Sequence, residues 1–140
     1  MKDIVINKIQ SIQRCVERAR EEHQGDPVGF DTNYSRQDAA ILNVIRACEQ
    51  AIDLANHIIK THKMGIPTSS AESFDLLEKK RVIDQRLSKT LKNMVHFRNT
   101  VIHTYQRTNL AIVKAVILSG LDDLILFGDC VLAFINSHPS

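Results

Sequence analysis

Long stretches without glycine or proline are the strongest constraint on the fold of this chain. Its 140 residues contain five glycines and three prolines; two of the prolines precede residue 70 and the third is Pro139. Apolar residues recur every three or four positions through most of the remainder, and no useful length alternates with period two. The pattern predicts an all-α fold.

Two long helices are expected in the first half of the chain. The first has an apolar stripe that starts at Ile4 and ends before Gly25, and the next stretch reads as a loop, GDPVGFDTNY. Ser35 is a suitable N-cap for the second helix. We expect that helix to stop near Met64, because the residues GIP follow.

Three polar residues mark helix starts in the second half. Ser69 and Glu72 form a capping box for a short helix that runs to about Lys80. Asp84 is a cap for a fourth helix and Asn109 for a fifth, each followed by a long apolar stripe. The sequence thus predicts an up-and-down four-helix bundle with an additional short helix, in a single domain over residues 1–140.

The apolar faces of the fourth and fifth helices are wider than a bundle of this size can bury. Residues 115–121 are apolar around nearly the whole circumference of the fifth helix. An exposed apolar face usually marks a contact with a partner or a second copy. We therefore expect a homodimer.

Composition favours a cytoplasmic protein without structural disulfides. The N-terminal residues MKDIVINKIQ are interrupted by polar side chains, unlike a signal peptide, and residues 115–121 are too few to span a bilayer. The cysteines are Cys15, Cys48 and Cys130, an odd number without a CxxC pair. We expect all three to be buried free thiols.

Positive charge is concentrated in one segment. Residues 79–107 hold eight lysines and arginines and one acid, a net charge of +7, which leaves −5 for the rest of a chain whose total is +2. Such a zone is typical of contact with an anion, either nucleic acid or nucleotide phosphate, although a solvated helix face has the same composition.

The basic zone contains the octapeptide RNTVIHTY, with Arg98, Asn99, His103 and Tyr105. On a regular helix Arg98 and His103 point about 140° apart, whereas Asn99 and His103 share a face. For Arg98 and His103 to act on one site, either the helix loosens between them or two subunits share the site across a two-fold axis. The β-branched residues at 100–102 make loosening plausible.

One arginine and one histidine from each of two subunits are a sufficient minimum set for breaking an RNA backbone without metal. A base takes the 2′-hydroxyl proton, an acid protonates the leaving 5′-oxygen, and a cation stabilises the charge on phosphorus. Arg98 has the planar donor fork for phosphate and His103 the suitable pKa range. The amide of Asn99 can orient the histidine or the phosphate.

The motif resembles the Arg-x4-His-x-Tyr signature of the HepT toxins, a branch of the HEPN superfamily. The resemblance covers nearly the whole chain, from the first helix to about Phe134. It is carried by the motif passage RNTVIHTYQ and by three further passages, CEQAIDLANHI, MGIPTSSAESFDLL and LSKTLKNMVHFRN.

The resemblance implies a homodimeric HEPN domain that acts as a metal-independent endoribonuclease, the toxin of a type VII toxin–antitoxin system. It implies that the cognate antitoxin is a minimal nucleotidyltransferase of the MNT type, which transfers AMP onto the motif tyrosine. In this chain Arg98 and His103 take the catalytic positions, Asn99 supports them, and Tyr105 is the AMP acceptor. No cofactor or metal is implied.

Two other functions are compatible with the sequence. One is a non-catalytic subunit that binds nucleotide or substrate for a two-component nucleotidyltransferase, in which Arg98 only binds phosphate. The other is a helical scaffold with a structural motif. His103 favours the ribonuclease, because a binding subunit has no evident need for a titratable histidine.

Glu49, Asp53 and His57 stand four residues apart on the second helix and share one face. Their residue types permit metal binding, but a polar seam is the preferred interpretation. In that interpretation Asp53 orients His57 or meets a basic residue of the fourth helix. A supporting role beside Arg98 is a further alternative.

Overall fold

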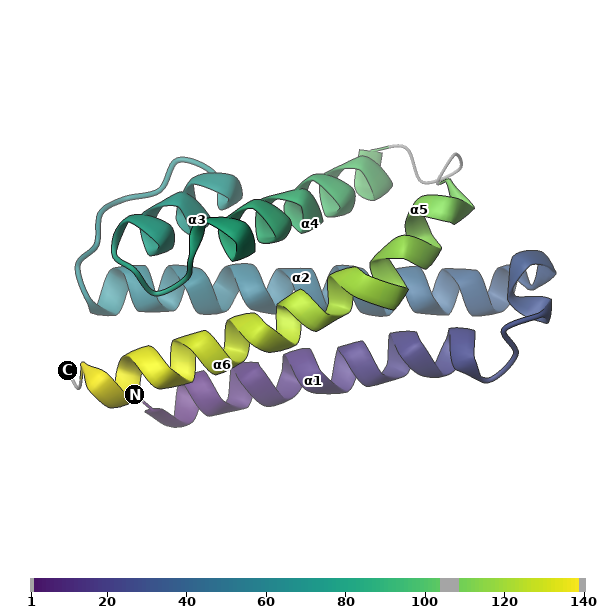
Figure 1. Cartoon of the computed structure of the whole chain (residues 1–140), viewed down its shortest axis with the longest axis horizontal. Coiled ribbons are helices and arrows are strands. Elements are labelled where there is room, and N and C mark those ends of the chain that lie inside the picture. The colour runs from purple at the N-terminus through teal and green to yellow at the C-terminus, as the bar shows by residue number, and fades with distance from the viewer. Residues whose placement is uncertain (1, 104–108, 139–140) are drawn as a thin grey trace.

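The computed structural model describes residues 2–103 and 109–138, with the side chain of His103 excepted. Four long helical rods run alternately up and down, and the two ends of the chain lie at the same end of the molecule (Figure 1). The first two rods are α1 (Lys2–Gln24) and α2 (Tyr34–Thr61), which share the most extensive contact in the molecule. The predicted all-α bundle is confirmed.

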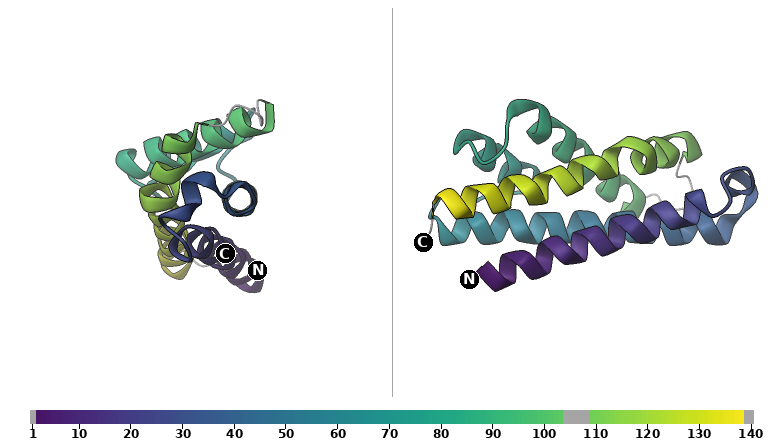
Figure 2. Two further views of the ribbon diagram at one scale, coloured as in Figure 1. Left: turned by 90° about the vertical axis from the view of Figure 1, so that its right-hand side faces the viewer. Right: turned by 60° about the horizontal axis from the view of Figure 1, so that its bottom comes forward.

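The short helix α3 (Ser70–Lys79) packs beside the third rod, α4 (Gln85–His103). The last rod consists of α5 (Leu110–Ala115), the π-helical turn η3 (Val116–Gly120) and α6 (Leu121–Ser137). Figure 2 shows α4 and α1 on opposite sides of the bundle, with α2 and α6 between them.

The core consists of aliphatic and aromatic side chains from every long helix. Phe74 of α3 and Phe127 of α6 meet edge to face, with ring centroids 5.5 Å apart. Both rings are almost fully buried, together with Ile12, Leu54 and Leu91 from the other three rods. This packing fixes α4 against α2 and α6 and so positions the candidate site.

Three predicted caps are confirmed. Ser69 Oγ accepts a hydrogen bond from the backbone N–H of Glu72, Asp84 Oδ1 from that of Leu87, and Asn109 Oδ1 from that of Ala111. The predicted cap of the second helix was wrong, because Asn33 and not Ser35 accepts from the N–H of Arg36. A 3₁₀ turn, η1 (Gly29–Thr32), brings the chain into position for α2 to start two residues early.

Two other boundaries differ from the prediction. Helix α2 ends at Thr61 rather than near Met64, because Lys63 adopts a left-handed conformation with φ of 52° and Met64 N–H bonds back to the carbonyl of Ile59. The last rod is interrupted by η3, where the hydroxyl of Ser119 donates to the carbonyl of Ala115.

Cysteine burial is only partly as predicted. All three cysteines are free thiols, but Cys48 alone is fully buried, while Cys15 and Cys130 are half-buried at the edges of α1 and α6. Within the described residues, no helix is long and apolar enough to cross a membrane.

Candidate functional site

Helix α4 places Arg98 on the side that faces the core. The helix buries Leu87, Leu91 and Val95 against α2 and α6, and Arg98 follows Leu91 by seven residues, which is two helical turns. The side chain of Arg98 is only 17% exposed. A guanidinium in such a position needs hydrogen-bond acceptors, because burying an unpaired charge is costly.

Two neighbouring helices supply those acceptors. Arg98 Nη1 donates to Glu49 Oε1 of α2 at 2.9 Å, and Nη2 lies 3.4 Å from Ser70 Oγ at the start of α3. The Nε atom of Arg98 is buried and has no hydrogen-bond partner among the described residues. The guanidinium is therefore held on two sides and keeps donors that no described residue uses.

Cys48 lies next to this ion pair. Burial raises the pKa of its thiol to about 12, against the smaller lowering effect of the Arg98 charge. Its sulfur points toward the carbonyl of Met94 on α4, 3.9 Å away. Cys48 is thus a neutral packing residue beneath Glu49 and Arg98.

The backbone remains α-helical from Arg98 through His103. The loosening proposed as one way to bring Arg98 and His103 together is therefore absent over these residues, and the two positions lie about 140° apart around the helix. Of the two sequence-based alternatives, a site shared between subunits is the one compatible with this backbone. Asn99 is exposed beside Arg98, and Tyr105 lies outside the described residues.

The polar seam on α2 is divided between two neighbours. Glu49 reaches Arg98, whereas Asp53 pairs with Lys8 of α1 at 3.9 Å, so Asp53 is not the residue that meets the fourth helix. Burial lowers the pKa of His57, assisted by the positive charge of Lys8. The described part of the chain contains no group of three or more His, Cys, Asp or Glu side chains arranged to hold a metal ion.

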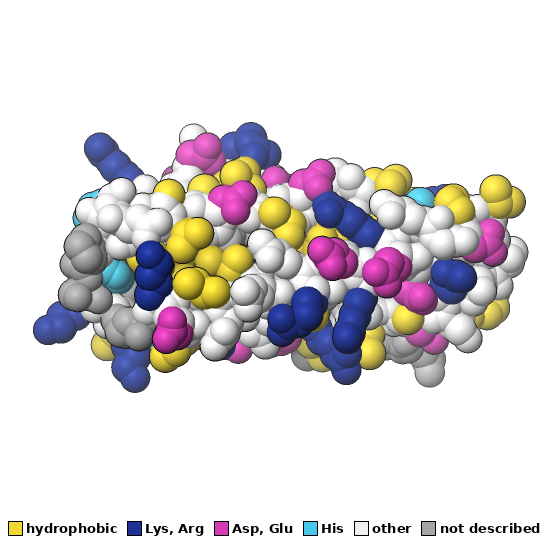
Figure 3. All heavy atoms as spheres, turned by 90° about the horizontal axis from the view of Figure 1, so that it is seen from below, with side chains coloured by type: hydrophobic (Ala, Val, Ile, Leu, Met, Phe, Trp, Pro, Cys, Tyr) yellow, Lys and Arg dark blue, Asp and Glu magenta, His cyan; other side chains and the backbone are white. Residues whose placement is uncertain are grey.

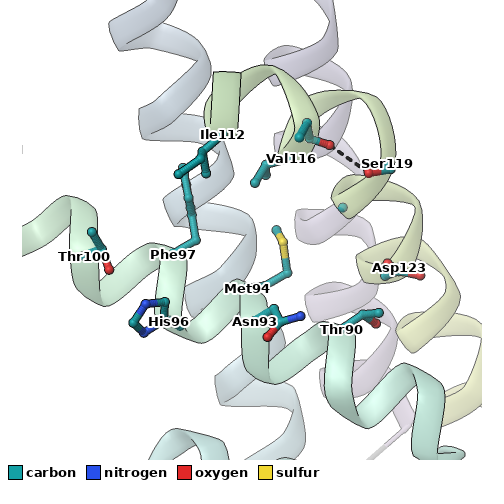
Figure 4. Close-up of a pocket in the computed structure, with 12 residues that line it drawn as sticks. Thr90, Asn93, Met94, His96, Phe97, Thr100, Ile112, Val116, Ser119 and Asp123 are labelled. Atoms are coloured by element: carbon teal, nitrogen blue, oxygen red, sulfur yellow. Dashed lines mark hydrogen bonds between the residues drawn. The ribbon is translucent and has the colours of Figure 1, made fainter. Parts of the chain in front are cut away.

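A pocket of about 400 Å³ opens between α4 and the α5–η3 turn (Figure 4). Met94, Phe97 and Val116 line it with apolar groups, and His96 and Thr100 lie at its edge on the exposed side of α4. Gly120 lets the side chain of Met94 lie against the π-helical turn, since a Cβ atom at this position would lie 2.8 Å from the sulfur of Met94. The sequence did not predict this pocket.

Apolar side chains remain exposed on the rods predicted to have wide apolar faces. Ile102 of α4 is 53% exposed, and Leu118 of η3 is 64% exposed. Leu126 of α6 and Ile112 of α5 are also exposed. This agrees with the expectation that the fourth and fifth helices have more apolar surface than one bundle covers.

Comparison with known proteins places this chain in a family. The family model described as Ribonuclease HepT-like matches residues 7–131. The chain belongs to the HepT-like ribonuclease family. This HepT-like protein is 45% identical to the mRNA nuclease HepT of Shewanella oneidensis over 133 residues. The matched region covers 95% of this chain and 99% of that nuclease.

Solved structures are similar over the same length. A tri-AMPylated Shewanella oneidensis HEPN toxin in complex with an MNT antitoxin superposes with a TM-score of 0.89 at 45% identity, covering 95% of the HepT-like chain and 99% of the toxin. A cytosolic protein of unknown function, YutE from Bacillus subtilis, has a TM-score of 0.84 at 14% identity over 99% and 92% of the two chains. The second likeness shows the fold alone.

The sequence placed Arg98 and a polar seam on α2 that could support it, but it assigned the contact with the fourth helix to Asp53. In the structure Glu49 makes that contact. Ser70 gave no signal, because its neighbour Ser69 already explained the serine pair as a helix cap.

Proposed function

We propose that this HepT-like protein is a metal-independent endoribonuclease and the toxin of a toxin–antitoxin pair. The observation that carries the proposal is the position of Arg98, whose guanidinium is held by Glu49 of α2 and Ser70 of α3. Arg98 lies on α4, the helix that also carries Asn99 and ends at His103. The similarity to the mRNA nuclease HepT over 95% of the chain supports it. Because its proposed substrate is mRNA, we expect the enzyme to act in the cytoplasm.

The proposed reaction is attack by the RNA 2′-oxygen on the adjacent phosphorus. One His103 removes the proton of the 2′-hydroxyl, a new bond forms between the 2′-oxygen and phosphorus, and the bond to the 5′-oxygen breaks. A second histidine protonates that leaving oxygen, so the products are a 2′,3′-cyclic phosphate and a 5′-hydroxyl. Arg98 stabilises the negative charge that develops on the phosphoryl oxygens.

The two histidines require two subunits, so the active form is a homodimer. The exposed apolar groups Ile102 and Leu118 offer surface for a second copy. The dimer also allows Arg98 and His103 to act in one cleft, although their positions lie about 140° apart around α4.

Control of the activity is assigned to Tyr105. In the proposal, a cognate MNT nucleotidyltransferase transfers AMP from ATP to the phenol oxygen, and pyrophosphate leaves. The related toxin that carries AMP groups in complex with an MNT antitoxin supports this assignment. Each adenylate places bulk and negative charge beside the site where RNA must bind.

The first test is induction of this chain alone in bacterial cells, beside Arg98→Ala and His103→Ala versions. We expect growth arrest and loss of RNA integrity from the wild-type chain only. If all three strains grow alike with folded protein present, the ribonuclease proposal fails and a nucleotide-binding subunit becomes the better interpretation.

A separate test addresses Tyr105. The wild-type chain and a Tyr105→Phe variant are each co-expressed with the cognate nucleotidyltransferase, and intact-mass spectra are recorded. We expect adenylate mass on the wild-type chain and none on the variant. Equal modification of both chains rules out Tyr105 as the acceptor.

A further inference from the structure

The exposed face of α4 is polar and has no acidic side chain. No Asp or Glu occurs from Gln85 to His103, and the exposed positions of this helix include Lys89, Asn93 and His96. The side of α1 and α6 differs, because basic and acidic side chains are interspersed there (Figure 3). A helix face that only needs solvation usually carries both signs of charge, as that side does.

Carboxylates reach the cations of α4 only from neighbouring helices. Asp75 of α3 pairs with Lys92 at 2.7 Å, and Asp123 of α6 lies 3.6 Å from Arg86. Lys89 has no ion-pair or hydrogen-bond partner among the described residues and is exposed. The face therefore keeps positive charge available for an anionic ligand.

The pocket between α4 and η3 adjoins this face. Asn93, His96 and Thr100 belong both to the exposed face and to the pocket lining (Figure 4). The apolar floor at Met94 and Phe97 suits a flat uncharged group, and Asp123 at the lining disfavours a phosphate inside it. A nucleobase fits these properties, with its phosphate left outside near the lysine.

We propose that the exposed face of α4 is a path for single-stranded RNA, in which Lys89 binds a backbone phosphate and the adjoining pocket receives a base. Lys89 and Asn99 are ten residues apart, about 15 Å along the helix, which is the length of about four stacked nucleotides. The path leads toward the position of His103, which is fourteen residues after Lys89 and on the same face of α4, whereas Arg98 lies on the opposite, core-facing side. This inference rests on the proposed ribonuclease function, since it names how the substrate reaches that site.

Base pairing makes the pocket inaccessible, because a base in a duplex is stacked and its edge is occupied. The proposed path therefore selects single-stranded segments. A second consequence concerns Asp75, which competes with RNA phosphate for Lys92 at the edge of the path.

The test measures binding of a short fluorescein-labelled single-stranded RNA of mixed sequence by anisotropy over a series of salt concentrations. All proteins carry His103→Ala, so that the RNA stays intact. Lys89→Ala is expected to weaken binding several-fold and to reduce the slope of log affinity against log salt by about 0.7. The matched control is Arg14→Ala, which removes one charge from the exposed surface of α1, and it is expected to leave both quantities unchanged.

Two further variants separate the phosphate contact from the base contact. Asp75→Asn releases Lys92 and is expected to tighten binding and steepen the salt slope. Ala115→Leu fills the pocket from its α5 side and is expected to weaken binding without changing the slope. A duplex of the same sequence is expected to bind more weakly and to be unaffected by Ala115→Leu.

The proposal is overturned if Lys89→Ala matches Arg14→Ala in affinity and slope. It is also overturned if Ala115→Leu changes the monomer–dimer equilibrium in sedimentation while RNA binding stays constant, because the pocket then belongs to a contact between copies. Cleavage by the chain with His103 intact is scored separately. If the chain with His103 intact cleaves RNA but Lys89→Ala leaves RNA affinity unchanged, this inference is wrong and the proposed function stands. If Lys89→Ala weakens RNA binding as expected but no cleavage occurs, the proposed function is wrong and this inference stands.

Discussion

At the scale of single residues, Arg98 determines the character of the site. A charged side chain on the core face of a helix is stable only with acceptors close by, and Glu49 and Ser70 provide them. The same contacts fix where the guanidinium lies before any substrate arrives. Such preorganisation is what a transition-state cation requires.

Glu49→Ala tests this positioning. The variant leaves Arg98 without its carboxylate, and since Glu49 is 44% exposed we expect a modest loss of about 1 kcal/mol in the free energy of unfolding. We expect the rate constant for RNA cleavage to fall more than tenfold with KM less affected, because Arg98 loses its orientation. Glu49→Gln retains an oxygen acceptor and is expected to recover part of that rate.

Asp53→Ala is the matched control for Glu49. It removes a carboxylate four residues along the same helix, one that pairs with Lys8 instead of Arg98. We expect unchanged cleavage from it, as measured by initial rates. Equal loss of cleavage in the Asp53 and Glu49 variants contradicts the positioning role.

The thiol of Cys48 provides a probe of the same region. Because burial raises its pKa to about 12, almost no thiolate exists at neutral pH, and we expect it to resist Ellman's reagent in the folded protein and to react on unfolding. The measurement compares wild type with Cys48→Ala. If Cys48 is protected, the two folded proteins release the same amount of dye from Ellman's reagent. Rapid labelling of Cys48 shows that the core beneath Arg98 is open.

At the scale of elements, local signals predicted helix starts better than helix interiors. Ser69, Asp84 and Asn109 are caps as expected, because an N-cap contact depends on residues only two or three positions away. Asn33 and Ser35 are both good cap residues, and the choice between them depends on η1, whose packing is tertiary.

The interruption at η3 and the contacts of Arg98 could not be predicted from the sequence, because both depend on tertiary packing. Residues 115–121 are uncharged, and Ser119 and Gly120 are the polar and small residues within them. Such a pair permits a distortion of the helix but does not specify a π-helical turn. The turn becomes intelligible only with Met94 of α4 lying against Gly120. Ser70 likewise acquires its role only when α3 and α4 come together.

Asp84→Ala tests the cap of the helix that carries the site. The backbone N–H of Leu87 loses its acceptor at 2.8 Å, and we expect a loss of about 1 kcal/mol in the free energy of unfolding, measured by urea denaturation. Asp38→Ala is the control, because Asp38 is exposed within α2 and its side chain makes no ion pair or hydrogen bond with the described residues. Its expected change is within about 0.5 kcal/mol, and a similar loss from both variants excludes the cap as the cause.

At the scale of the whole molecule, His57 makes stability depend on pH. Its folded-state pKa lies below the ordinary value of 6.5, first because of burial and then because of Lys8, so the unfolded chain binds more protons in the range just below 6.5. The free energy of unfolding therefore falls as pH drops through this range. We expect His57→Gln to lose less stability than wild type between about pH 7.5 and about pH 5.5 in urea titrations. Identical pH dependence in the two proteins contradicts this assignment.

The most direct measurement is RNA cleavage by the purified chain in the presence of EDTA, after mass spectrometry has shown Tyr105 to be free of AMP. The account predicts cleavage that leaves 2′,3′-cyclic phosphate ends, and a loss of about a hundredfold or more in both Arg98→Ala and His103→Ala. Intact RNA after incubation with the folded wild-type protein, or equal cleavage by all three proteins, contradicts it.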